Sequence, residues 1–287
     1  MGPQNVGILM AADQGLFADA GLEVLVTHPD SPSHSLPYVA NRTVEFGVSH
    51  LPQVVIAREE GTPVLAVGSL LPHPTASMIW LRKSKIGGLR GLKGKTVAIP
   101  GLPYQEALLQ SVLKRVGLTV EDVKIDRVGY GLTQALERGR ADAIFGGSWN
   151  VEGAVLEARG LRTVVRRVAD LEVPAYDELV LIAREDLVSD DPRLVRKVLK
   201  AVARGTAAAV THPGAALEVI ARSGETDPAM GRSAWRAGLE ATLPLLSKGG
   251  PISPDRAEGL ADWMSDEGLT QEALPASVLL TNCYVSP

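Results

Sequence analysis

Short apolar runs alternate with helix-like segments over the first two thirds of the chain. The runs with the character of β-strands are Val24–Thr27, Val44–Gly47, Val64–Val67, Ser77–Leu81, Thr96–Ile99, Val123–Val128, Ala143–Phe145, Thr163–Val165 and Leu179–Ala183. The segments with helical spacing between them include Leu51–Glu60, Tyr104–Val116, Leu132–Arg138 and Val151–Ala158. Strands that alternate with helices are typical of parallel sheets, so an α/β fold is predicted.

The last third of the chain is predicted to be helical. Leu194, Val195 and Val198 recur at helical spacing, and Asp191 stands just ahead of Pro192 as an N-cap signal. Further helices are predicted at about Pro213–Arg222, Pro228–Leu243 and Pro254–Glu267. Each of these segments opens with a proline, which is favoured in the first turn of a helix.

The length of 287 residues is enough for two lobes of α/β size. An α/β body followed by a helical tail favours a two-lobed protein whose chain crosses between the lobes twice. The crossings are predicted near Pro72–Ala76 and Glu178–Ala183. Residues 77–180 would then form a central lobe, and residues 1–76 with 181–287 an outer lobe. Ligands of such proteins bind in the cleft, at the carboxyl ends of strands and the N-termini of helices.

The composition argues against several classes of partner and site. The net charge is −4 and no run of lysines and arginines forms a nucleic-acid footprint, so no nucleic-acid partner is expected. Cys283 is the single cysteine, so no disulfide or cysteine-based metal site is predicted within the chain. No stretch approaches the roughly 20 apolar residues that span a bilayer. The first residues, Met1–Gln4, lack the basic start and apolar core of a signal peptide.

Motifs of catalytic chemistry are missing from the sequence. No nucleophile elbow, phosphate-binding P-loop, His-x-x-x-His pair or Cys-x-x-Cys pair is present. Gly129-Tyr130-Gly131 lacks the third glycine of a dinucleotide loop and is interpreted as a strand-to-helix turn. The histidines are His28, His34, His50, His73 and His212. None of them pair at metal-ligand spacing, so neither a metal nor a cofactor is expected.

Several segments, in order along nearly the whole chain, resemble a known family. The widely shared segments are Ala11–Phe17 and Gly94–Val97, and the narrower ones are His73-Pro74, Trp149-Asn150-x-Glu152 and Pro174-x-Tyr176-x-Glu178-Leu179-Val180. The series resembles the type II solute-binding proteins of ABC importers for sulfonates, nitrate and aminopyrimidines. The narrower segments are most similar to the branch that binds the pyrimidine precursor of thiamin.

The resemblance implies a type II solute-binding fold, a small planar heterocycle as the ligand, a membrane ABC permease as partner, and a monomer. The resemblance also implies an extracytoplasmic location, either in the periplasm or at the membrane on a lipid anchor. The family's first strand and its export signal are expected ahead of Pro3 and are absent from this chain. One alternative is a binding protein for a sulfonate or another small anion. A second alternative is a pyrimidine synthase. Those enzymes carry a cysteine-rich motif, and this chain, with Cys283 as its single cysteine, cannot supply that motif.

A 4-aminopyrimidine presents a flat π-face, an amine donor and ring-nitrogen acceptors. Trp149 follows a buried strand and is a candidate aromatic plate, with packing in the lobe interior as the alternative. Glu152 is a candidate acceptor for the amine, because a carboxylate forms strong charge-assisted hydrogen bonds; helix capping is its alternative. Asn5 precedes the first helix, where N-capping is the alternative, and the resemblance favours a ligand contact.

Four further residues complete the predicted site. His50 ends a strand and His73 lies between two prolines at the first crossing; each is predicted to face the cleft, with a surface turn as the alternative. Asn150 and Tyr176 belong to the segments that carry the resemblance. Glu178 lies beside Tyr176 near the second crossing, where a structural role is at least as well supported as a ligand contact.

Overall fold

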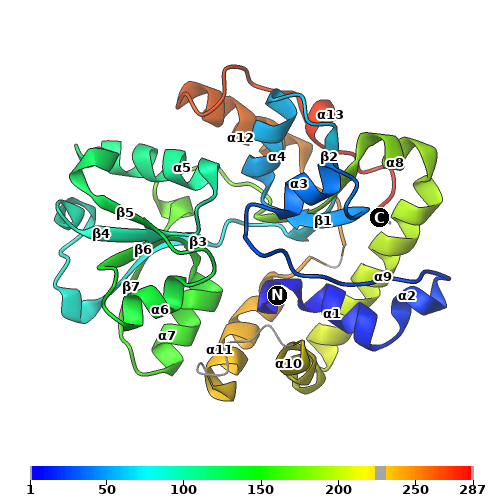
Figure 1. Cartoon of the computed structure of the whole chain (residues 1–287), viewed down its shortest axis with the longest axis horizontal. Coiled ribbons are helices and arrows are strands. Elements are labelled where there is room, and N and C mark those ends of the chain that lie inside the picture. The colour runs from blue at the N-terminus through cyan, green and yellow to red at the C-terminus, as the bar shows by residue number, and fades with distance from the viewer. Residues whose placement is uncertain (1, 224–230, 248, 286–287) are drawn as a thin grey trace.

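The computed structural model describes residues 2–223, 231–247 and 249–285, and these residues form two lobes, each built on one sheet (Figure 1). The three-stranded sheet has the order β1 (Phe46–Ser49), β8 (Leu179–Arg184), β2 (Val64–Leu71). The five-stranded sheet has the order β5 (Lys124–Arg127), β4 (Thr96–Ile99), β6 (Ala143–Ser148), β3 (Ala76–Leu81), β7 (Thr163–Arg167). The predicted α/β class is confirmed.

Parallel pairing was predicted throughout, and this holds only for β4, which is parallel to β5 and β6. β8 is antiparallel to β1 and β2, and β3 is antiparallel to β6 and β7. β3 and β8 are the strands that follow the two connections between the sheets, over residues 72–75 and 168–178. A strand that enters from the other lobe starts at the opposite end of its sheet, which reverses its direction.

The predicted strand Val24–Thr27 is wrong. Residues 22–29 have no regular secondary structure, and Val24 and Leu25 are 41% and 86% exposed. The segment has the alternation of a strand, but no strand of the described chain pairs with it. A β-prone sequence forms a ladder only when a neighbour supplies hydrogen-bond partners.

The helices cover both sheets. In chain order they are α1 (Val6–Asp13), α2 (Leu16–Asp19), α3 (Ser35–Ala40), α4 (Leu51–Glu59), α5 (Pro103–Lys114), α6 (Leu132–Glu137), α7 (Ala154–Ala158), α8 (Glu185–Asp190), α9 (Pro192–Thr211), α10 (Pro213–Arg222), α11 (Arg232–Thr242), α12 (Pro254–Asp266) and α13 (Ala276–Leu279). In the described parts of the chain, no helix is long and apolar enough to cross a membrane.

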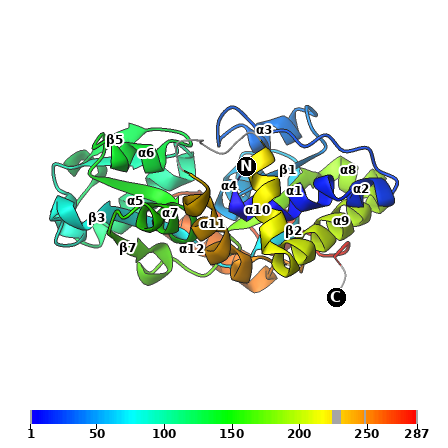
Figure 2. The same cartoon turned by 90° about the horizontal axis from the view of Figure 1, so that it is seen from below.

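The helical last third is confirmed, and the Asp191 side chain caps α9 by accepting a hydrogen bond from the Leu194 backbone N–H. The start of the predicted helix Pro228–Leu243 lies outside the described residues. This third does not stay with the outer sheet alone. Helix α11 packs against α7 and the turn Trp149–Gly153 of the five-stranded lobe (Figure 2). The division into residues 77–180 and the rest therefore stays a prediction.

Helices α1 and α9 pack unusually closely through two glycines. A Cβ on Gly205 would contact the Gly7 carbonyl oxygen and lie 2.7 Å from the Ala11 nitrogen. A Cβ on Gly7 would in turn overlap the Thr206 hydroxyl. These glycines bring α1, and with it the start of the chain, against the outer lobe.

We expect Gly205→Ala to lower the free energy of unfolding by about 1–3 kcal/mol. The added methyl group would overlap the backbone of α1, which cannot avoid the contact by a change of rotamer as a side chain could. Urea denaturation measures the change. The matched control is Gly214→Ala in α10, where a Cβ meets nothing within 4 Å; its stability should be unchanged or raised. Equal losses in the two variants would contradict the close helix contact.

Candidate ligand-binding cleft

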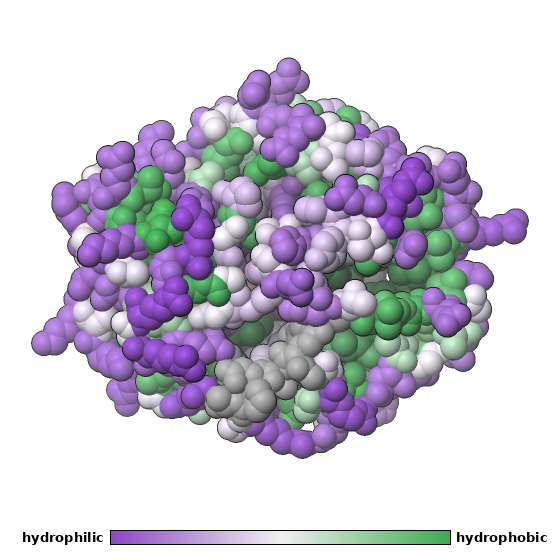
Figure 3. Space-filling view, viewed as in Figure 1, coloured by the Kyte–Doolittle hydropathy of each residue, from purple (hydrophilic) through white to green (hydrophobic). Residues whose placement is uncertain are grey.

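A cavity of about 1180 Å³ opens between the lobes. The outer side contributes residues 22–29 and 43–50, and the five-stranded lobe contributes parts of 130–134 and 151–155. Figure 3 shows the molecule hollowed near its centre, with hydrophobic surface on one side of the hollow. The cavity therefore has walls from both lobes, as the position of the predicted cleft requires.

The lining of this cavity contains neither lysine nor arginine among the described residues. Its ionisable carboxyl groups are those of Glu23, Glu45 and Glu152. Its neutral polar side chains include Gln4, Asn5, Ser49, Gln53 and Gln134. Anion sites use cationic side chains or free backbone N–H groups to offset the ligand's charge. This cavity is instead suited to a ligand that donates hydrogen bonds.

Glu152 lies in a π-helical turn, Trp149–Gly153, between β6 and α7. One carboxylate oxygen accepts a hydrogen bond from the Ser148 backbone N–H at 2.6 Å. Burial raises the pKa of the Glu152 carboxyl above its ordinary value, against the opposing effect of that N–H. In such surroundings the charged form of the carboxylate is stabilised by any hydrogen-bond donor that a ligand places at its second oxygen.

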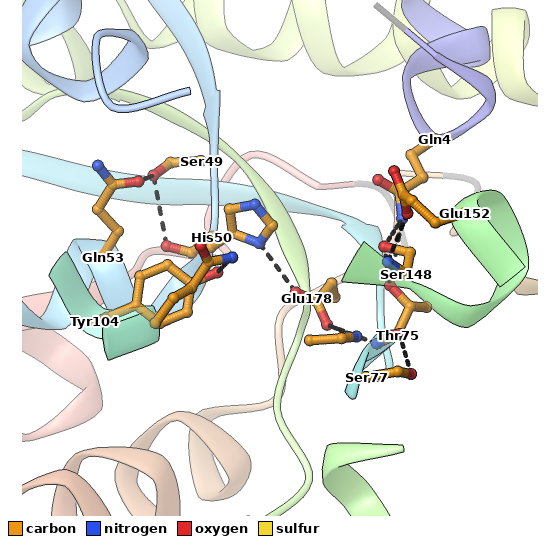
Figure 4. A network of polar contacts seen from close by, with 12 residues as sticks. Gln4, Ser49, His50, Gln53, Thr75, Ser77, Tyr104, Ser148, Glu152 and Glu178 are labelled. Carbon is orange, nitrogen blue, oxygen red and sulfur yellow. Dashed lines mark hydrogen bonds and ion pairs between the residues drawn. The ribbon is translucent and has the colours of Figure 1, made fainter. Parts of the chain in front are cut away.

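The start of the chain contacts the opposite lobe next to Glu152 (Figure 4). Gln4 Nε2 donates to the Ser148 hydroxyl at 2.9 Å and to the Thr75 hydroxyl at 3.2 Å. Asn5 follows Gln4 in the cavity wall, and its Oδ1 is buried without a hydrogen-bond partner in the described chain. An unsatisfied acceptor of this kind is costly unless a ligand or water donates to it.

His50 follows β1, and its ring points toward Glu178 (Figure 4). Its Nδ1 lies 2.9 Å from Glu178 Oε1, and the other Glu178 oxygen accepts from the backbone N–H groups of Thr75 and Ala76, at 2.5 and 3.1 Å. Nδ1 therefore carries the proton, which leaves Nε2 of a neutral ring as an acceptor. Glu178 is 1% exposed and holds the connection between the lobes, which agrees with the structural role considered for it.

Comparison with known proteins places the chain in a family. Residues 2–216 match the family model described as NMT1/THI5 like. The chain belongs to the NMT1/THI5-like family. This confirms the resemblance drawn from the sequence.

Two relatives and one solved structure illustrate this family and its fold. The chain is 30% identical to a putative thiamine biosynthesis protein of Haemophilus influenzae, over 95% of this chain and 86% of that protein. It is 31% identical to the formylaminopyrimidine-binding protein of Halalkalibacterium halodurans, over 74% of this chain and 64% of that protein. The alkanesulfonate-binding protein SsuA of Xanthomonas axonopodis pv. citri, bound to MOPS, superimposes with a TM-score of 0.75 at 17% identity, covering 98% and 96%. The predicted solute-binding fold is confirmed.

Three residues predicted for the site of this NMT1/THI5-like protein, Asn5, His50 and Glu152, line the cavity. Trp149 does not, although it was predicted to do so. It lines a separate small pocket, where the Arg167 guanidinium lies 4.0 Å from its ring centre. Because residues 149–153 form a π-helical turn, which is wider than an α-helical one, Trp149 and Glu152 point to different sides.

The remaining predicted residues also lie outside the cavity lining. Asn150 is fully buried and donates to the Thr242 hydroxyl at 2.8 Å, which ties the turn to α11. His73 is exposed beside Arg256, in agreement with the alternative that it is a surface turn residue. Tyr176 is fully buried. Their segments carry the resemblance to the family, but Asn150 and Tyr176 are buried in the structure and His73 is exposed at its surface.

Sequence reasoning missed an aromatic residue of the cavity. Tyr130 follows β5 and is 52% exposed, and its ring centre lies 4.7 Å from that of His28 on the outer side. Its hydroxyl donates to the Pro29 carbonyl at 3.4 Å, so the contact joins both sides of the cleft. The signal was available, because an aromatic residue in the glycine turn after a strand stands where clefts form.

Proposed function

We propose that this protein binds an unphosphorylated aminopyrimidine precursor of thiamin in the cleft between its lobes. The observation that carries the proposal is a cavity without lysine or arginine in its described lining, with the half-buried Glu152, whose carboxyl pKa is raised by its burial, in its wall. The name of the Halalkalibacterium halodurans relative, a formylaminopyrimidine-binding protein, supports the same ligand class.

The three predicted residues in the lining suit such a ligand. Glu152 accepts from the exocyclic amine, the Asn5 amide pairs with a ring nitrogen or the amine, and His50 Nε2 accepts a further donor. Tyr130 offers an aromatic face at the cleft mouth. Asn5 and His50 stand on the outer lobe and Glu152 and Tyr130 on the central lobe, residues 77–180. A ligand held from both lobes stabilises the closed state over the open one.

We also propose that the protein acts by binding rather than by catalysis. The described lining has no lysine to form an imine and no cysteine nucleophile, and Cys283 is exposed elsewhere. The closed, ligand-loaded form would be recognised by a membrane ABC permease, outside the cytoplasm and as a monomer. In this scheme binding of ligand and of permease are thermodynamically linked.

Titration calorimetry tests the ligand class. We expect a formylated aminopyrimidine to bind at least about tenfold more tightly than taurine, since a sulfonate would meet carboxylates without a compensating cation. The buffer alone is the control for dilution heat. Binding of taurine without binding of any aminopyrimidine would overturn the proposal in favour of the sulfonate alternative.

A further inference from the structure

Helix α11, from the C-terminal part of the chain, contributes the side chain of Trp235 to the cavity lining. α11 lies between α7 and the start of the chain (Figure 1 and Figure 2). A Cβ built on Gly238 would lie 3.5 Å from Val155 Cγ2 and 3.6 Å from Pro3 Cγ. Trp235 is one turn earlier on the same face of α11, so it lies in the corner where these three segments meet. It is outside residues 2–216, which match the family model.

The Trp235 indole contains a hydrogen-bond donor that has no acceptor. Its Nε1 is buried and makes no hydrogen bond within the described chain. An indole N–H can donate but cannot accept, so its partner must be an acceptor. A buried donor without a partner costs free energy comparable to a lost hydrogen bond. Its position in the wall of a ligand cavity therefore indicates that the ligand supplies the acceptor.

Asn5 provides the complementary group in the same corner. Its Oδ1 is a buried acceptor without a partner in the described chain, and it belongs to the turn Pro3–Asn5, which packs against α11. The Asn5 and Trp235 side chains do not bond to each other. A molecule that satisfies both must present a donor and an acceptor side by side. The edge of an aminopyrimidine does so, because its amine donates and the neighbouring ring nitrogen accepts.

We infer that the Trp235 indole N–H donates to a ring nitrogen of the bound heterocycle and so makes the site specific for a pyrimidine over a pyridine. The inference rests on the proposed function, because it names a further residue of the same site. Glu152 and Asn5 accept hydrogen bonds from the ligand, whereas Trp235 donates one to it. A pyridine that keeps the amine but has C–H in place of that nitrogen leaves the indole donor buried and unpaired, and a site built on such a bond rejects the analogue that lacks it.

Titration calorimetry compares the formylated aminopyrimidine with two analogues, each with one ring nitrogen replaced by C–H. We expect the parent protein to bind one of the two analogues at least about tenfold more weakly than the pyrimidine, the size of one lost hydrogen bond. Trp235→Phe keeps an aromatic ring but removes the donor. It should bind the pyrimidine at least about tenfold more weakly than the parent does, and it should bind the pyrimidine and that analogue equally.

The matched control is Trp263→Phe in α12. The Trp263 Nε1 is also buried and without a partner in the described chain, but this tryptophan is not part of the cavity lining. Its replacement should change neither the affinity for the pyrimidine nor the preference for it over the analogues. A loss in Trp263→Phe equal to that in Trp235→Phe would overturn the inference, because position in the cavity would then make no difference.

Three further outcomes would overturn it. The parent could bind the pyrimidine and both analogues equally, Trp235→Phe could keep the parent's preference, or Trp235→Phe could lose the same affinity for all three ligands, which would reduce Trp235 to a packing residue. A parent that binds no aminopyrimidine would instead refute the proposed function itself, and the inference with it.

A measurement on the parent alone tests the inference without a folded variant. The chain has four tryptophans, each with one indole N–H signal in a proton–nitrogen correlation spectrum. We expect one of these signals to move downfield when the pyrimidine binds and to stay in place with the analogue that lacks the acceptor. If the pyrimidine binds and no indole signal responds in this way, Trp235 does not donate to the ligand.

Discussion

Replacing Glu152 by glutamine is expected to weaken aminopyrimidine binding about 100-fold, or about 2.7 kcal/mol, the size of a hydrogen bond to a charged group. The carboxylate lies in the cavity wall with one oxygen on the Ser148 N–H. Glutamine can keep that contact through its carbonyl, but its amide then presents a donor to the ligand's amine. Titration calorimetry of the folded variant measures the loss.

The same substitution should not destabilise the protein at neutral pH. Burial raises the pKa of Glu152, so the stability that this group contributes is present at low pH, where it is protonated. That stability is lost as the pH rises through the raised, folded-state pKa. Glutamine cannot ionise. The variant should therefore be at least as stable as the parent above that pKa, as urea denaturation at several pH values would show.

The matched control is Glu45→Gln, which removes an exposed carboxylate from the outer wall of the same cavity. Its effect on affinity should stay below about threefold, because exposed charges are screened by water and salt. Equal losses in the two variants would mean that the ligand senses only the general charge of the cavity. Unchanged affinity in Glu152→Gln would remove Glu152 from the site.

Replacing Glu178 by leucine is expected to lower the free energy of unfolding by about 3–5 kcal/mol, the range for breaking a buried ionic contact. Its carboxylate serves the two backbone N–H groups of Thr75 and Ala76 and the ring of His50. Leucine fills similar space but leaves these donors without an acceptor. Equilibrium denaturation in urea measures the change.

The control for this prediction is Glu185→Leu. Glu185 pairs with Arg58 at 2.9 Å, but its side chain is 50% exposed, so the loss should stay below about 1 kcal/mol. Comparable losses in the two variants would contradict the role of Glu178 as the anchor of the connection. A destabilised but folded Glu178→Leu protein should also bind ligand more weakly, because His50 loses the partner that fixes its ring.

Local patterns predicted those elements whose signals lie within the element itself. Helix α10 has the predicted bounds, Pro213–Arg222, since proline starts it and its apolar residues repeat at helical spacing. β4 likewise matches the predicted Thr96–Ile99. The Val24–Thr27 pattern failed because pairing depends on a second strand. The antiparallel direction of β3 and β8 depends on where the chain crosses, which no local pattern encodes.

The site could be predicted only in part for a similar reason. Glu152 follows a buried strand, and its place in the cavity wall was predictable from that position. Trp149, three residues earlier, was assigned to the cleft because it directly follows the buried strand, but it lies in a π-helical turn and lines a separate pocket. The burial of Asn150 depends on Thr242 in α11, a contact 92 residues away in sequence. The segments that carry the family resemblance and the side chains that line the cavity therefore overlap only in part.

The carboxylate of Glu178 also limits how the lobes can move. It ends the second connection between the sheets, while its hydrogen bonds hold Thr75 and Ala76 at the end of the first. Two interlobe connections that are held together at a single point cannot slide past one another or twist independently. We therefore expect the lobes to move mainly by a hinge rotation about an axis that passes near that carboxylate. A single angle should then describe the path between the open and closed forms, and scattering curves recorded during ligand titration should fit a series of structures that differ in that angle alone.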